Sequence, residues 1–377
     1  MKYIVLLSFA FLWSYADSAC VTPLGQKSEC VSLYSCQPLL TAFEQRPLPS
    51  SVVSFLRQSS CGFDGYVPTV CCGPLPAEQP TTTVRSRPVP PPSISDKVEP
   101  VNPEDSFLMP RDKCGLDENG DRIYGGQFTD LDEFPWMALM GYRPNGGGLL
   151  VYRCGGVLIN HRYVLSAAHC VVGAIETAVG QIASVRLGEW DIQNDLDCVN
   201  GTCADPVQEY AVQSSYPHPG FSDRHKNRQD DISLVRLAQR VRFTYYVQPI
   251  CLTGNTRLNV GYDVFVAGWG KTLSGKSSPI KLKLNLPIAD KGDCDTKYRT
   301  LGAALTDKQI CAGGVFAKDA CTGDSGGPLM RNVGGTWESV AVVSFGYGCG
   351  RDGWPGVYTS IASYRDWIEQ TMRSSNV

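Results

Sequence analysis

Short apolar runs of the kind that forms β-strands recur through the last two thirds of the chain. From residue 123 onward, glycine and polar residues separate runs such as "GGVLI", "YVLSAA", "DVFVAGWG", "SVAVVSF" and "GVYTSI". Many short strands with turn residues between them are typical of an all-β barrel or sandwich. The pattern therefore predicts an all-β domain over residues 123–377.

One helical period stands out, at the end of this domain. Trp367, Ile368 and Met372 follow helical spacing, and Ser363 with Asp366 resembles a capping box. We therefore expect a helix near the C-terminus, started by the Ser363 side chain.

The first residues have the pattern of a secretory signal peptide. Lys2 precedes the apolar run "YIVLLSFAFLW", and the small residues of "SYADSAC" follow. An apolar run of roughly ten residues is short of the ~20 that a membrane span needs. We expect residues 1–19 to be a signal peptide, no membrane span, and a secreted, extracellular mature protein.

Two further zones separate this signal from the β domain. Residues 20–72 hold six cysteines, a number typical of a small unit stapled by disulfides, whose pairing the spacing alone leaves open among fifteen possibilities. Residues 73–122 are rich in proline and polar residues and lack periodicity, which indicates an extended linker.

Composition narrows the functional class. A hydrophobic content of 43% is that of a globular protein, and a net charge of −3 argues against a nucleic-acid-binding protein. The sixteen cysteines, none in a CxxC pair, indicate an oxidised disulfide framework rather than a zinc site.

Three motifs supply the groups of nucleophilic catalysis. "CTGDSGGPL" places Ser325 among glycines that permit a tight turn, with backbone N–H groups available for an oxyanion. "LSAAHC" places His169, a candidate general base, beside Cys170. "DDISLVRL" supplies the carboxylate that orients the base: we expect Asp231 to be buried at the start of an alternating strand and Asp230 to be solvated.

Together these motifs resemble the trypsin/chymotrypsin family of serine proteases. The chain order of His169, Asp231 and Ser325 matches, as does "GWG" at 268–270, and the resemblance spans residue 123 to the C-terminus. It implies a double six-stranded β-barrel with a C-terminal helix. It also implies that Ser325 is the nucleophile, His169 the base and Asp231 its orienting acid, and that the amides of Gly323 and Ser325 form the oxyanion hole.

The same resemblance implies the substrate. Asp319 matches the residue at the base of the primary specificity pocket, where a buried carboxylate favours a substrate Arg or Lys. Gly346 and Gly356 match the pocket-wall glycines. Ala320 stands where many relatives have a serine that helps bind lysine, so we expect arginine to be preferred.

The stretch "ENGDRIYGG" matches the family's activation site. Cleavage after Arg122 by an upstream trypsin-like protease would free Ile123 as a new N-terminus. Its ammonium group would then pair with Asp324, beside the nucleophile.

Residues 20–72 resemble the regulatory clip domain of arthropod serine proteases, including prophenoloxidase-activating and easter-type enzymes. The two resemblances imply a set of disulfides. Cys114–Cys251 would tie the segment before the cut to the catalytic domain, and Cys198 and Cys203 are left to a local loop. The remaining implied pairs are Cys20–Cys71, Cys30–Cys61, Cys36–Cys72, Cys154–Cys170, Cys294–Cys311 and Cys321–Cys349.

Two further features concern one acidic loop. "EWDIQNDLDC" gathers Glu189, Asp191, Asn194 and Asp197, matching a calcium loop of trypsin-like enzymes, although a solvated acidic loop fits the pattern nearly as well. "NGT" makes Asn200 a candidate glycosylation site.

The leading hypothesis is a secreted zymogen of an arginine-directed endopeptidase in an innate-immune cascade of the haemolymph. Its expected protein substrates are prophenoloxidase, in melanisation, or a pro-Spätzle-like cytokine, in Toll signalling, and serpins are its expected inhibitors. The alternatives are a non-enzymatic clip-domain adaptor and a digestive trypsin. Adaptors of this family usually lack the serine, which is present here as Ser325, and a digestive enzyme has no use for the N-terminal unit.

Overall fold

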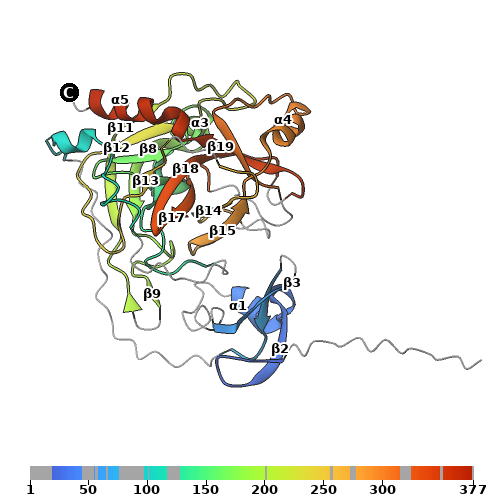
Figure 1. Ribbon diagram of the computed structural model, residues 1–377. Helices are drawn as coiled ribbons and strands as arrows, with labels where there is room; N and C mark the ends of the chain where they lie inside the picture. Colours follow the sequence, from blue (N-terminus) through green and yellow to red (C-terminus); the bar gives the residue numbers. More distant parts are fainter. Residues whose placement is uncertain are drawn as a thin grey trace, which may run out of the picture. The chain divides into compact units, whose positions relative to one another are not determined.

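A computed structural model describes residues 19–44, 55, 58–64, 67–75, 97–100, 102–116, 128–199, 202–254, 258–271, 277–314, 324–348 and 351–375. The chain divides into two compact units, residues 1–81 and 82–377 (Figure 1).

The described part of the N-terminal unit contains a small antiparallel sheet and the helix α1. Its strand order is β1-β2-β4-β3, and disulfides join Cys20 to Cys71, Cys30 to Cys61 and Cys36 to Cys72, which are the three pairs that the clip resemblance implies. Leu39 and Cys36 have no exposed surface. The elements are β1 Ala19–Val21, β2 Lys27–Ser32, the 3-10 turn Leu33–Ser35, α1 Gln37–Glu44, β3 Ser60–Asp64 and β4 Val67–Cys71.

The first half of the second unit is a closed β-barrel. Its strands run in the order β11-β12-β7-β6-β5-β8, and every neighbouring pair is antiparallel. The predicted strands "GGVLI" and "YVLSAA" fall in β6 and β7. The bounds are β5 Met137–Pro144, β6 Val151–Leu158, β7 Tyr163–Ser166, β8 Gly180–Leu187, β11 Gln208–Pro217 and β12 Ser233–Leu237.

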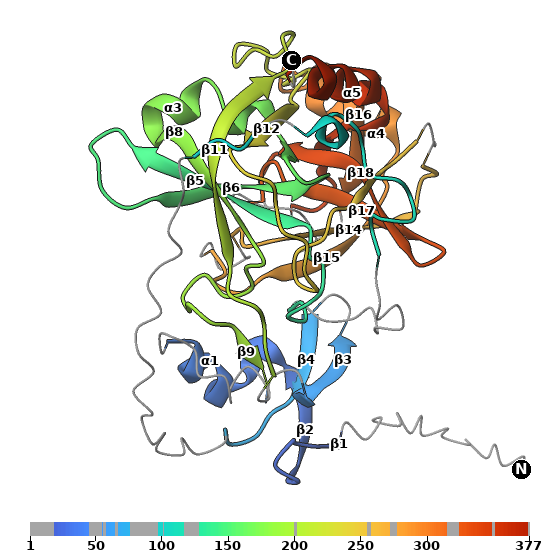
Figure 2. The ribbon, with the colours of Figure 1, turned by 90° about the vertical axis from the view of Figure 1, so that its left-hand side faces the viewer.

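The second half is a barrel-like sheet packed beside the first (Figure 2). Its path is β15-β14-β17-β18-β19-β16, the bridge between Ile288 and Ala312 draws its two edges together, and the short strand β13 pairs in parallel with β18. The fold thus has the two barrels expected from the resemblance. The bounds are β13 Cys251–Leu252, β14 Asp263–Gly268, β15 Leu282–Pro287, β16 Gln309–Gly313, β17 Pro328–Val333, β18 Thr336–Phe345 and β19 Pro355–Ser360.

A C-terminal helix is present, but its predicted start is wrong. α5 covers Arg365–Ser374, and Ser363 lies in the 3-10 turn Ala362–Tyr364 that precedes it, so Tyr364 takes the cap position without a side-chain bond. Ile368 and Met372 are fully buried, as the period predicted. The other elements are the 3-10 turns Pro103–Ser106 and Ala168–Cys170, α3 Ala174–Ala178, α4 Lys291–Arg299, β9 Cys198–Val199 and β10 Thr202–Cys203.

Two expectations about the "DDISLVRL" segment are also wrong. Every residue of β12 is buried, so the expected alternation of buried and exposed residues is absent, because neighbouring elements cover both faces of the strand. On its outer face, the Arg236 guanidinium donates to the carbonyl of Ser375, just after α5. The Asp230 side chain is only 15% exposed and accepts a hydrogen bond from the Tyr364 hydroxyl at 2.7 Å.

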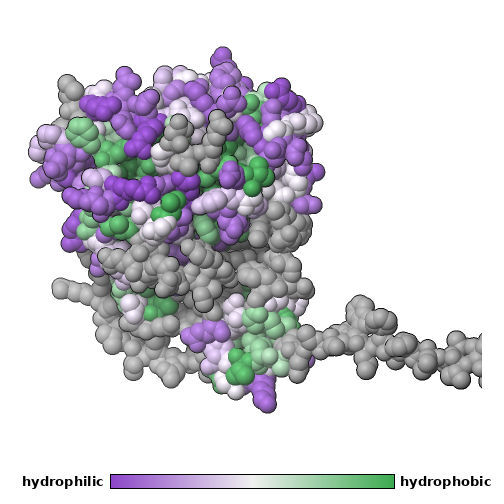
Figure 3. All heavy atoms as spheres, in the orientation of Figure 1, coloured by the Kyte–Doolittle hydropathy of each residue, from purple (hydrophilic) through white to green (hydrophobic). Residues whose placement is uncertain are grey.

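The core of the second unit contains a cluster of aromatic rings. Trp337 packs edge-on against Phe134 and Phe265, and Trp136 donates its indole N–H to the Met330 sulfur. On the face shown in Figure 3, hydrophilic residues cover most of the described surface of this unit. No helix within the described ranges is long and apolar enough to cross a bilayer.

Candidate active site

The turn after β7 and the loop before β12 bring a histidine and an aspartate together. His169 lies in the turn Ala168–Cys170, and Asp231 lies two residues before β12, which pairs with β7. The imidazole Nδ1 is 2.8 Å from one carboxylate oxygen of Asp231, and the His169 backbone N–H donates to the other at 3.0 Å. The carboxylate therefore fixes both the position of the residue and the orientation of its ring.

Asp231 is held as a carboxylate although it has no exposed surface. Burial alone would raise its pKa, but His169 and the hydrogen bonds from His169 and Ser344 outweigh burial and bring the pKa of Asp231 below its ordinary value. The Ser344 hydroxyl donates at 2.5 Å to the oxygen that faces the imidazole. Sequence reasoning missed Ser344, because only the fold brings the end of β18 to Asp231.

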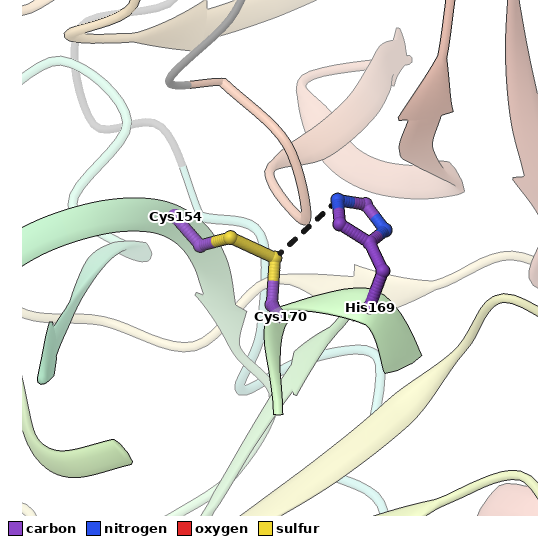
Figure 4. Close-up of side chains that lie close together, drawn as sticks. All are labelled: Cys154, His169 and Cys170. Atoms are coloured by element: carbon purple, nitrogen blue, oxygen red, sulfur yellow. Dashed lines mark hydrogen bonds between the residues drawn. A yellow bond between two sulfur atoms is a disulfide. The ribbon is translucent and has the colours of Figure 1, made fainter. Parts of the chain in front are cut away.

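The disulfide Cys154–Cys170 anchors the histidine from the other side (Figure 4). Cys170 Sγ lies 3.8 Å from His169 Nε2. The ligand-type atoms of Cys154, His169 and Cys170 lie within 4.8 Å of one another. The sulfur atoms of Cys154 and Cys170 are bonded to each other, so neither is the thiolate that a metal site needs.

Ser325 lies in a turn that glycine makes possible. Its carbonyl oxygen accepts the Gly155 N–H at 2.9 Å and is 3.6 Å from Cys170 Sγ, so the serine and the histidine lie against the same disulfide. Gly326 has φ +80°, and a Cβ there would come within 2.2 Å of the Ser166 hydroxyl. Glycine is therefore required directly after the serine.

Asp324, one residue earlier, is seated in the "GWG" motif. Its carboxylate accepts the Gly270 N–H at 2.8 Å. A Cβ at Gly268 or at Gly270 would come within 2.2 or 2.3 Å of its oxygens. The two glycines of the motif therefore leave the space that the Asp324 carboxylate occupies beside Ser325.

The remaining predicted pocket residues lie partly within the described structure. Gly346 is exposed just after β18, and Gly356 is buried in β19 opposite Ala312. Several predicted residues lie outside the described ranges: Arg122, Ile123, Asn200, Asp319, Ala320, Gly323, Cys321 and Cys349.

The predicted loop disulfides are formed where the structure describes them. Cys198 pairs with Cys203, and Cys294 with Cys311. Cys114 pairs with Cys251 at the start of β13, so the segment before Arg122 is covalently tied to the catalytic unit.

The acidic loop is more buried than a solvated loop would be. Glu189, Asp191 and Asp197 are at most 5% exposed, whereas Asn194 is exposed and its amide donates to Asp191 at 2.7 Å. One oxygen of Asp197 accepts the Trp190 N–H at 2.9 Å, and the other, Oδ1, is buried without a hydrogen-bond partner.

Burial and neighbouring charges shift the pKa values of the ionisable groups in and around this loop. Burial and the nearby Asp197 raise the pKa of Glu189 to about 7, and burial raises the pKa of Asp197 to about 6. Arg186 pairs with Glu189 at 3.2 Å but also with Glu209 at 2.7 Å. Burial lowers the pKa of Lys281 to about 8, although the charges of Glu133 and of the two loop carboxylates act to raise it. The loop thus gathers desolvated carboxyl groups whose charge nearby cations offset only in part.

Comparisons with known proteins agree with this geometry. Residues 123–368 match the family model "Trypsin", and residues 20–72 match "Regulatory CLIP domain of proteinases". The chain is 63% identical to phenoloxidase-activating enzyme 1 of Spodoptera litura, with 100% of both chains covered. It is 40% identical to serine protease 7 of Drosophila melanogaster, covering 98% of this chain and 96% of that protein.

A solved structure extends the agreement to three dimensions. The Grass clip serine protease of the Toll pathway, from Drosophila, matches with a TM-score of 0.58 and 29% identity, covering 95% of this chain and 98% of that one. The two-domain match and the full-length relatives together settle the family. The chain belongs to the clip-domain, trypsin-like serine proteases.

Proposed function

We propose that this protein is the zymogen of an arginine-directed endopeptidase that activates prophenoloxidase. The contact between His169 and the buried Asp231 carboxylate, beside the Ser325 turn, supports the chemistry. The full-length likeness to a phenoloxidase-activating enzyme supports the substrate. Secretion rests on the N-terminal signal pattern alone.

Each of these residues has its own role in the proposed reaction. Ser325 Oγ attacks the substrate carbonyl and gives its proton to His169 Nε2, while Nδ1–H remains bonded to Asp231 and orients the ring. His169 then passes the proton to the leaving amine, and a water molecule repeats the sequence to release the acyl group. The amides of Gly323 and Ser325 stabilise the oxyanion, and the Asp319 carboxylate pairs with the substrate arginine.

The substrate is tested with protein cut at Arg122 and two candidate precursors, prophenoloxidase and a pro-Spätzle-like cytokine. We expect prophenoloxidase to be cleaved after an arginine and to gain phenoloxidase activity, with Ser325→Ala protein as the inactive control. Cleavage of the cytokine precursor alone would move the enzyme to the Toll branch. Cleavage of neither would contradict the role of terminal activator.

We further propose that the acidic loop binds Ca²⁺. The buried, unpartnered Oδ1 of Asp197 and the desolvated Glu189 carboxylate fit a divalent cation, with Asp191 and Asn194 contributing further oxygens. The ion would supply positive charge that offsets the repulsion between the carboxylates. Its role here is to stabilise the loop, and no catalytic step depends on it.

Calcium removal should lower thermal stability. We expect excess EDTA to reduce Tm by about 5–10 °C relative to a Ca²⁺ concentration near a hundred times Kd, because binding at that level stabilises by about 2.7 kcal/mol. Asp197→Asn should abolish the shift, whereas Asp195→Asn, at an exposed position of the same loop, should keep it. Equal Tm values of the wild type in calcium and in EDTA would contradict the site.

A further inference from the structure

A basic loop leads from β11 to the catalytic aspartate. It carries Arg224, His225, Lys226 and Arg228, and the first three of these are exposed. The side chain of Asn227 donates to the Ala304 carbonyl at 2.6 Å, and its backbone carbonyl accepts from Gln309 at 2.7 Å. The loop is therefore fixed against the second barrel immediately before its last basic residue.

Arg228 has a backbone conformation that side chains rarely adopt. Its φ is +44°, in the left-handed region, which disfavours residues other than glycine, asparagine and aspartate. Such strain is found most often where a side chain has a functional position to hold. Here the side chain is half-buried, and its Nη1 donates to the Ser344 carbonyl oxygen at 3.1 Å.

Ser344 joins this guanidinium to the catalytic groups. Its hydroxyl donates to Asp231, which in turn orients His169. The register of β18 against β19 shifts between Val343 and Phe345, so Ser344 has no pairing partner in β19. Arg228 therefore bonds to a carbonyl near the end of β18. The preceding residue, Val343, accepts the N–H of Gly326 in the Ser325 turn at 2.9 Å.

An extended substrate needs that carbonyl. The Ser325 turn adjoins β18 through the bond from Gly326 N–H to Val343 O, and Gly346 directly follows β18, so a peptide that reaches both would run along the end of β18. There its backbone would pair with the last residues of β18, beyond Val342, where the pairing with β17 ends, and its N–H groups would bond to the β18 carbonyls. In the described structure, Arg228 already holds one of these acceptors. The guanidinium therefore competes with the peptide for the Ser344 carbonyl.

We propose that Arg228 selects substrates that have an acidic residue directly before the cleaved arginine. A substrate carboxylate is a stronger acceptor for a guanidinium than a neutral carbonyl, because the bond is charge-assisted and bidentate. It would draw Arg228 away from Ser344 and so free that carbonyl for the peptide backbone. The proposal rests on the arginine-directed cleavage proposed above and adds the neighbouring subsite.

The chain's own activation sequence has an acidic residue directly before the arginine. In "NGDR", Asp121 directly precedes Arg122. A second copy of this chain would therefore satisfy both preferences, and the sequence supplies a suitable probe. The peptide pair Asn-Gly-Asp-Arg and Asn-Gly-Ala-Arg, each with a chromogenic amide leaving group, differs only at the residue in question.

The test compares kcat/KM for the two peptides with fully activated enzyme. We expect the wild type to prefer the aspartate peptide about fivefold to tenfold, mainly through KM, and to lose part of the preference at 1 M salt. Arg228→Gly should abolish the preference and should hydrolyse the alanine peptide faster than the wild type, since the competitor for Ser344 is gone. Glycine also accepts the positive φ, so this variant should fold.

Two matched variants complete the design. Arg228→Lys keeps the charge and should retain a reduced preference, whereas Arg224→Gly removes the same charge from an exposed site on the loop and should leave the ratio unchanged. Equal rates for both peptides with the wild type, or an undiminished preference in Arg228→Gly, would overturn the proposal. Failure to cleave either peptide would instead overturn the arginine-directed function.

Discussion

Replacing Ser325 by alanine should reduce kcat on an arginine peptide about 10⁵–10⁶-fold and leave folding intact. The side chain removed is the nucleophile, and the turn around it is held by the backbone: Gly155 N–H bonds to Ser325 O, and Gly326 N–H bonds to Val343 O. Alanine disturbs neither bond. The measurement is the initial rate of amide hydrolysis by protein cut at Arg122, together with the thermal midpoint.

The neighbouring residues give a graded control for this result. Asp231→Asn should lower kcat about 10⁴-fold, because an amide can stabilise the wrong tautomer of His169. The double variant with Ser325→Ala should be no worse than Ser325→Ala alone, since the residues act as one unit. A Ser325→Ala protein with more than a hundredth of wild-type activity would show that another group is the nucleophile.

Removing the charge of Asp324 should leave the cut enzyme about 10²–10³-fold less active. The carboxylate sits against Gly268 and Gly270, directly before Ser325, where the Ile123 ammonium is proposed to pair with it. Breaking a buried pair by deleting one partner costs about 3–5 kcal/mol, and 1.4 kcal/mol corresponds to tenfold. The measurement is the kcat/KM of Asp324→Asn after cleavage at Arg122.

Asp263→Asn provides the matched control, because Asp263 is exposed on β14 at the other end of the strand that ends in Gly268. It loses the same charge and should keep full activity. If Asp324→Asn also kept full activity after cleavage, the ammonium–carboxylate switch would be wrong.

Local sequence patterns were enough to identify much of the candidate site. Ser325, His169 and Asp231 each stand in a short motif whose neighbours constrain the backbone, so each could be identified without the fold. Ser344 and Arg228 could not be, because they reach the site through pairing of β18 with β19 and through a loop fixed by Gln309. Neither has a local signature.

The three wrong predictions each have a physical cause. The sequence leads us to expect a solvated Asp230, but the fold brings the Tyr364 hydroxyl and Lys308 against it. The Ser363 cap failed because a 3-10 turn precedes α5. The alternation expected in β12 is absent because the strand is covered on both faces. For Asp230 and β12, tertiary contacts decided what a local pattern left open.

The disulfide pairing of the N-terminal unit could not be predicted from cysteine spacing. Spacing alone leaves fifteen pairings open, and only the clip resemblance implied Cys20–Cys71, Cys30–Cys61 and Cys36–Cys72. The structure has these three pairs.

Cleavage of one bond, after Arg122, should convert an inert chain into a protease. The most direct test is active-site titration of the purified full-length protein, before and after limited cleavage by a trypsin-like protease, with N-terminal sequencing of the products. We predict that titratable sites rise from near zero to one per molecule as the sequence Ile-Tyr-Gly-Gly appears. The two chains should part only under reduction, because Cys114–Cys251 joins them. Full titration of intact Arg122→Gln protein, or cleavage that exposes Ile123 without a gain in active sites, would contradict the account.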